Sequence, residues 1–214
     1  MNITCFPQAT YFTIASMSQI EHAPQPKLQP PGNGLPKHEL FFARILVGIK
    51  LRTTSYERAS KIFADEAGRI LDLVERLTPT DGERQILIKR LPGLEDSSRY
   101  WSIYMTLEHL RIVNSHSIAV ITSLINGVKP AITPSTAAVK PQEGIAQSVV
   151  QEFRQVCEEF QNSFPESTPV NSQVTLAHPW FGELNARQWH FFAGFHMGLH
   201  RKQIEKIIEG LNDR

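Results

Sequence analysis

The stretch from Asn185 to Leu211 constrains this chain most, because it predicts one long amphipathic helix with two histidines at its centre. Asn185 is a suitable N-cap and Gln188 follows three residues later, which is the spacing of a capping box. The side chains expected on the buried stripe recur in steps of three or four residues. They are Trp189, Ala193, His196, His200, Ile204, Ile207 and Leu211. Charged residues fall on the opposite side of the helix.

His196 and His200 lie in the middle of that stripe, one helical turn apart, so their side chains are neighbours. A buried imidazole without a partner costs about 1–3 kcal/mol, and one shared metal ion would satisfy both rings. The same spacing occurs in zinc proteases, which carry a glutamate directly after the first histidine. Met197 holds that place here, so the pattern predicts a metal site but not a protease of that class.

A third ligand is expected, because a catalytic metal site normally has three protein ligands and one open position. His109 and His116 are the candidates, since they fall on the same side of another predicted helix. We prefer His109, which lies near the middle of its helix between apolar neighbours. His116 lies two turns further on and would exchange roles with His109 if the helices met in a different register.

Apolar periodicity elsewhere predicts an all-α fold without a convincing strand. Residues 37–77 are expected to form one kinked helix or two, and two further helices are expected at about 97–126 and 143–164. The proline-containing stretch Pro130 to Pro141 predicts a crossover loop. Four principal helices with one long connection predict a four-helix bundle.

Prolines and glycines crowd residues 22–36, which predicts an extended or poorly ordered N-terminal arm over residues 1–36. The bundle is then expected to occupy residues 37–214. Met17 is an alternative start of the chain. The first twenty residues lack the basic and continuous apolar parts of a signal peptide.

Composition excludes several classes of partner. The 22 Lys and Arg residues nearly balance the 21 Asp and Glu residues, without a basic tract, so no nucleic acid or anionic membrane is expected. No apolar run approaches the 18 or more residues of a membrane span. Cys5 and Cys157 form no disulfide framework, which favours a cytoplasmic protein.

The residues around the histidines resemble the DinB-like (YfiT-like) superfamily of metal-binding four-helix bundles. The last helix of that superfamily is similar to Trp189…His196-x-x-x-His200-Arg201-Lys202-Gln203-Ile204, and its preceding segment is similar to His178-Pro-Trp-Phe-Gly. Its second helix resembles Trp101…Leu107-Glu108-His109-Leu110. The resemblance implies a triad of His109, His196 and His200 that holds zinc, nickel or iron with open coordination positions. Many members have a His-His doublet, and here Leu199 replaces its first histidine.

Three further residues are expected near this site. Gln203 is a candidate hydrogen-bond partner of the ligands. Trp189 is expected in the core beside the pocket, and His116 near the metal. Phe191, Phe195 and Leu199 form a second apolar strip on the same helix, which the N-terminal arm or a homodimer would cover.

Two functions stay open at this stage. By the resemblance, the chain is a metal-dependent enzyme that uses a low-molecular-weight thiol, for thiol S-transfer or thiol-dependent isomerisation of a small molecule. The alternative is a non-catalytic bundle that acts in stress response or as an interaction module, with a structural metal or none. A closed site with four protein ligands would favour this alternative, and an open pocket beside the metal would favour the enzyme.

Overall fold

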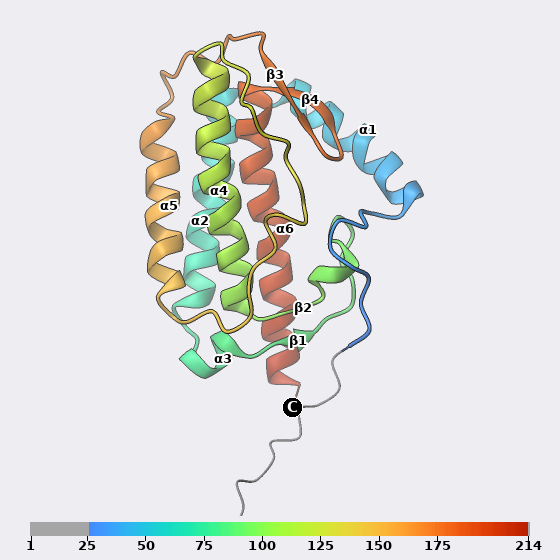
Figure 1. The fold of residues 1–214 in the computed structure, drawn as a ribbon. Helices are drawn as coiled ribbons and strands as arrows, with labels where there is room; N and C mark the ends of the chain where they lie inside the picture. Colours follow the sequence, from blue (N-terminus) through green and yellow to red (C-terminus); the bar gives the residue numbers. More distant parts are fainter. Residues whose placement is uncertain (1–25, 214) are drawn as a thin grey trace, which may run out of the picture.

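Four long helices lie side by side in the computed structural model, which describes residues 26–213 (Figure 1). They are α2 (Tyr56–Val74), α4 (Ile103–Ile125), α5 (Val149–Ser163) and α6 (Ala186–Asn212). Each helix packs on two others, so that α6 lies between α2 and α4, and α5 closes the bundle opposite α6. The predicted all-α four-helix bundle is therefore confirmed.

The direction of the helices requires the long connection that the sequence predicted. The first end of α2 meets the last end of α5 through a hydrogen bond from Tyr56 Oη to the carbonyl of Phe164. At the other end Arg154 pairs with Glu75, so α2 and α5 are antiparallel. Consecutive helices α4 and α5 run in the same direction. Residues 126–148, which connect them in the sequence, therefore return along the length of the bundle (Figure 1).

Local signals explain where α6 begins and misled us about α4. The Asn185 side chain accepts a hydrogen bond from Gln188 N, and the Gln188 side chain accepts one from Asn185 N, which confirms the capping box. The sequence placed the start of α4 at Ser97, but its N-cap is Ser102, whose hydroxyl accepts a hydrogen bond from Met105 N at 3.0 Å. Both positions are serines, so the sequence offered two equivalent caps.

Contrary to prediction, the described chain contains short strands. β1 (Ile86–Leu87) pairs with β2 (Tyr100–Trp101), and β3 (Thr175–His178) pairs with β4 (Gly182–Asn185), both antiparallel. Strands of two to four residues are too short to show alternation in the sequence. A short 3-10 helix at Asp96–Ser98 precedes β2. The 3-10 helix and β2 thus occupy the first part of the stretch that we had assigned to α4.

Residues 37–77, left open by the sequence, contain two helices. The chain breaks after α1 (Lys37–Thr53), and Ser55 caps α2 by accepting a hydrogen bond from Arg58 N at 3.2 Å. The single-turn helix α3 (Pro79–Glu83) follows α2. Figure 1 shows α1 projecting from the bundle beside the β3–β4 hairpin, where the Arg44 side chain donates to the carbonyl of Trp180 at 2.7 Å.

The described part of the arm, residues 26–36, lies extended against the turn before β2. Gly32 N and Gly34 N donate hydrogen bonds to the carboxylate of Glu95, and Gln29 N donates to Asp96. Residues 1–25, which include Met17 and Cys5, lie outside the described residues. The division into an arm and a bundle at residue 36 stays a prediction.

The bundle core is tightly packed where α2 meets α6. A Cβ atom on Gly194 would lie 3.0 Å from Phe63 N, so a larger residue here would require the two helices to move apart by a few tenths of an ångström. Across the bundle the rings of Phe63 and Phe160 stack with centroids 3.9 Å apart. No helix within residues 26–213 is long and apolar enough to cross a membrane.

Candidate metal centre

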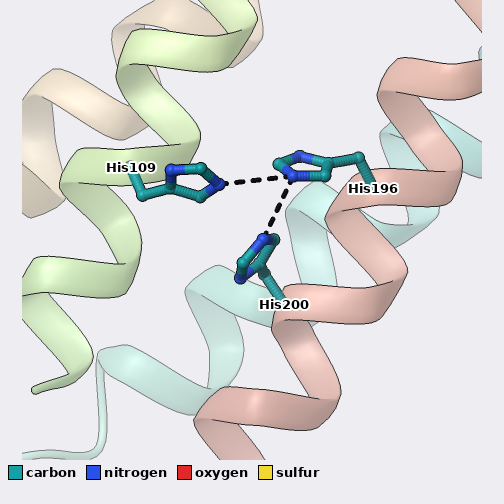
Figure 2. Close-up of side chains that lie close together, drawn as sticks. All are labelled: His109, His196 and His200. Atoms are coloured by element: carbon teal, nitrogen blue, oxygen red, sulfur yellow. Dashed lines mark hydrogen bonds between the residues drawn. The ribbon is translucent and has the colours of Figure 1, made fainter. Parts of the chain in front are cut away.

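Three histidine side chains meet between α4 and α6 (Figure 2). His109 comes from α4, and His196 and His200 come from adjacent turns of α6. The Nε2 atom of His196 lies 3.3 Å from Nε2 of His109 and 3.1 Å from Nε2 of His200. The structure therefore brings together the three residues that the sequence selected as ligands.

Two of these rings have a fixed tautomer. His109 Nδ1–H donates to the carbonyl of Val139 at 2.8 Å, since a carbonyl can only accept. His200 Nδ1–H donates to Oε1 of Gln203 at 2.7 Å, and the amide nitrogen of Gln203 donates to the carbonyl of Ser98 at 2.7 Å. In the neutral rings Nε2 of both histidines is unprotonated. Each presents a lone pair to His196.

The spacing of the Nε2 atoms fits one metal ion. Zinc binds histidine nitrogen at about 2.0–2.1 Å, so two ligands at a tetrahedral angle lie roughly 3.3 Å apart. The observed separations are 3.3 and 3.1 Å. Without an ion, one N–H of His196 can satisfy only one of its two neighbours. The donor set therefore fits a divalent metal better than a hydrogen-bonded cluster.

Burial keeps the three imidazoles in the form that binds metal. Desolvation lowers the pKa of His109 to about 4. It also lowers the pKa of His196 and His200 well below the ordinary value, and the neighbouring histidines lower both further. The rings are accordingly neutral at pH 7, as metal coordination requires.

The outer contacts of the triad are unequal. Metal-bound histidines usually donate their second N–H to an acceptor, and His109 and His200 do so. The Nδ1 atom of His196 is buried and has no hydrogen-bond partner among the described residues. The sequence predicted Gln203 as a hydrogen-bond partner of the ligands, and its side chain contacts His200.

Several contributors to the site carried little or no signal in the sequence. Trp101 packs its ring parallel to His200, with centroids 6.1 Å apart, and also lies near His109. Only the family resemblance pointed to this tryptophan. Val139 and Ser98 contribute backbone carbonyls, which any residue type could supply, so no side-chain pattern could have identified them.

A cavity of about 420 Å³ opens beside the triad, with His109 and His196 on its wall. It extends beneath α1, the β3–β4 hairpin and the crossover loop, and its size is typical of small-molecule sites. Its aromatic lining consists of Trp101, Trp180, Phe181, Trp189, Phe192 and Phe195. His116 also lines the cavity, but it is exposed and lies outside the triad.

The expected apolar strip of α6 faces this cavity in part. Phe195 and Leu199 line it, and Leu199 packs closely against Gly93. Phe191 is buried. Trp189 is buried as expected, and its indole N–H donates to the carbonyl of Leu176 at 3.2 Å. A homodimer stays a prediction.

Comparison with known proteins supports the resemblance. The sequence profile of the DinB superfamily matches residues 97–204, about half of the chain, and this range includes all three histidines. No protein of curated function matches the chain. A solved structure, TT2238, described as a four-helix bundle protein, is 20% identical and aligns over 71% of this chain and 98% of its own, with a TM-score of 0.46. From the profile match, this chain belongs to the DinB superfamily.

Proposed function

We propose that His109, His196 and His200 hold one divalent metal ion whose remaining coordination positions face the cavity. The observation that carries this proposal is the convergence of three neutral imidazoles beside an apolar cavity, with Nε2 of His196 at 3.3 and 3.1 Å from Nε2 of His109 and His200. Three neutral imidazoles suit zinc, nickel and iron alike. The function that fits is a metal-dependent enzyme using a low-molecular-weight thiol, for S-transfer or thiol-dependent isomerisation.

A divalent ion bound here supplies a Lewis acid that lowers the pKa of a thiol ligand, so that the thiolate forms near neutral pH. The protein's own residues prepare the site. The carbonyl of Val139 and the side chain of Gln203 accept hydrogen bonds from the Nδ1–H groups of His109 and His200, which leaves both Nε2 atoms free. The apolar walls limit water around the bound thiol and around the electrophilic substrate that the thiol attacks, which favours transfer over hydrolysis.

The alternative, a structural metal in a non-catalytic bundle, has less support. Structural zinc sites are generally closed by four protein ligands. The cluster within the described residues contains three, and His116, the natural fourth candidate, is exposed and outside it. A cavity next to the triad is also unnecessary for a structural metal.

Metal content tests the first part of the proposal. Protein purified without an affinity tag is expected to carry close to one equivalent of zinc, nickel or iron. The variant His196→Ala/His200→Ala should carry almost none, whereas His116→Ala should keep the full amount. Metal-free wild-type protein that binds none of the three ions on addition would contradict the site.

Thiol binding tests the second part. In cobalt-substituted protein, 2-mercaptoethanol is expected to shift the visible spectrum, because a thiolate enters the coordination sphere. Glutathione serves as a second, bulkier thiol. If the cobalt spectrum is unchanged by either thiol, the thiol chemistry is wrong and a structural metal is favoured.

A further inference from the structure

We propose that the cavity beside the triad binds an uncharged aromatic molecule that accepts a hydrogen bond from Nε2 of His178. This inference rests on the proposed function, since such a molecule would be the substrate placed next to the metal and thiol. It also narrows that function. A strongly polar or multiply charged substrate would find few partners in this cavity.

The cavity wall is mostly apolar. The lining includes Phe181 from the turn between β3 and β4, Phe192 from α6 and Val113 from α4. Planar aromatic ligands pack well against such rings, because flat apolar surfaces are removed from water on both sides. A volume of about 420 Å³ leaves room for a fused two-ring molecule.

Two polar groups on the wall, at Glu95 and Ser117, are already satisfied within the protein. The Glu95 carboxylate accepts hydrogen bonds from Gly32 N, Gly34 N, and the hydroxyls of Ser97 and Thr136. The Ser117 hydroxyl donates to the carbonyl of Val113. Among the described lining residues, Lys140 is the one ammonium group, and it lies half-buried on the crossover loop. A ligand with several charges would therefore lose hydration without gaining compensating contacts.

The buried indole N–H of Trp101, also on the wall, has no acceptor among the described residues. His178 likewise has a donor left over. Its Nδ1 accepts a hydrogen bond from Trp180 N at 3.1 Å, and a backbone N–H can only donate. In the neutral ring the proton therefore sits on Nε2, for which no described residue serves as acceptor. The ring is held by Phe181, Trp189 and Phe192, with centroid distances of 5.0, 5.4 and 4.3 Å.

His178 and the triad residue His196 both line the cavity. The ring of Phe192 packs against both, with centroid distances of 4.3 Å to His178 and 6.0 Å to His196. Burial lowers the pKa of His178 itself to about 4, so the ring stays neutral at pH 7 and keeps this tautomer. A ligand held by His178 would thus be directed towards the metal.

Titration with three related probes tests the inference on full-length protein, both metal-loaded and metal-free. The probes are 2-naphthol, naphthalene and 2-naphthalenesulfonate. Their binding is measured by calorimetry or ligand fluorescence at pH 7. We expect 2-naphthol to bind with one-to-one stoichiometry in both forms of the protein, and the sulfonate to bind at least about tenfold more weakly. If the sulfonate bound as tightly as 2-naphthol, the inference that the ligand is uncharged would be overturned.

The variant His178→Phe keeps a ring of similar size but removes the donor. It should weaken 2-naphthol about fivefold, the value of one ordinary hydrogen bond, and leave naphthalene binding unchanged. His178→Gln, which retains an N–H donor, should recover part of the loss. Equal binding of 2-naphthol to wild type and His178→Phe would overturn the role of His178.

Location is tested by filling the cavity. Val113→Phe should abolish binding of both uncharged probes, whereas Thr122→Phe, at an exposed position on the same helix outside the lining, should not affect it. Unchanged binding in Val113→Phe would overturn the site. Binding to metal-free protein also separates this inference from the proposed function, because it requires the cavity but not the metal.

Discussion

Helix α6 buries histidines in two places, and the two places differ in what surrounds them. His190 is almost fully buried, and its ring packs against Tyr56, Phe160 and Phe164 with centroid distances of 4.4, 5.2 and 5.9 Å. Two turns later, His196 and His200 face a third histidine. Both places contain a buried Nδ1 atom, at His190 and at His196, for which residues 26–213 offer no partner.

Burial of a histidine is therefore not evidence of metal binding in this molecule. At His190 the neighbours are three aromatic rings, so the imidazole acts as a packing residue whose Nδ1 has no partner among the described residues. At the triad, three imidazole nitrogen atoms converge, and the fixed tautomers of His109 and His200 leave a lone pair on the Nε2 atom of each. The convergence of acceptors distinguishes a ligand site from a buried ring.

The largest expected effect at the triad is on stabilisation by metal. A metal at 100 times its dissociation constant stabilises the fold by about 2.7 kcal/mol, which for a chain of this size raises Tm by roughly 5–10 °C. Differential scanning fluorimetry with added zinc or nickel should show this rise in wild type and in His190→Phe. His109→Ala should show almost none. A rise that disappears in His190→Phe, in a variant that still folds, would mean that the two places are not independent.

The next effect concerns Gln203, which is fully buried and holds His200. Gln203→Leu removes the acceptor of Nδ1–H, so His200 is free to change tautomer and orientation. Loss of such a partner typically reduces metal affinity about 10–100-fold. Competition with a chromophoric chelator measures the change. Gln203→Glu retains an acceptor and should bind metal more tightly than Gln203→Leu, and the reverse order would contradict this role.

His190 should have its effect on stability rather than on metal. Burial lowers its pKa to about 4, against an ordinary value of 6.5. Between these values the unfolded chain binds a proton that the folded chain does not, so folding stability falls as the pH decreases from 6.5 towards 4. The contribution of this residue is roughly 3 kcal/mol over the interval.

His190→Phe removes this proton-binding site and also the unpaired nitrogen. We expect urea unfolding of the variant, in metal-free protein, to depend less steeply on pH between 6.5 and 4 than that of wild type. Near pH 7 the free energies of unfolding of the variant and of wild type should differ less than they do near pH 4. An identical pH dependence would show that His190 is not protonated on unfolding in this range.

The same contrast explains how much the sequence could predict. The capping box and the histidine pair of α6 are local, because they depend on residues three or four apart along one helix. The four-helix bundle followed from apolar periodicity. The start of α4 did not, since Ser97 and Ser102 are equivalent caps until β1 pairs with β2.

Contacts made by returning segments were beyond prediction. The carbonyl of Val139 reaches His109 only because the crossover loop folds back over α4, and the carbonyl of Ser98 reaches Gln203 through the turn before β2. A backbone carbonyl carries no residue identity, so no sequence pattern marks it. The apolar residues of α1 predicted a helix correctly, but not that Phe41, Phe42 and Leu46 remain about 60% exposed on a helix that leaves the bundle.

The smallest expected effect tests the register that selected the third ligand. His109 and His116 lie on one side of α4, and only the antiparallel register with α6 decides which of them meets His196. Asn114 marks that register one turn beyond His109, where its amide contacts the sulfur of Met197 at 3.3 Å. His116 is exposed and lines only the cavity.

We therefore expect His116→Ala to change metal affinity by less than about twofold, near the limit of the chelator assay, because no ligand or outer partner is lost. A decrease as large as that of His109→Ala would mean that α4 is shifted by two turns relative to α6, and that the cavity wall and the ligand site have exchanged histidines.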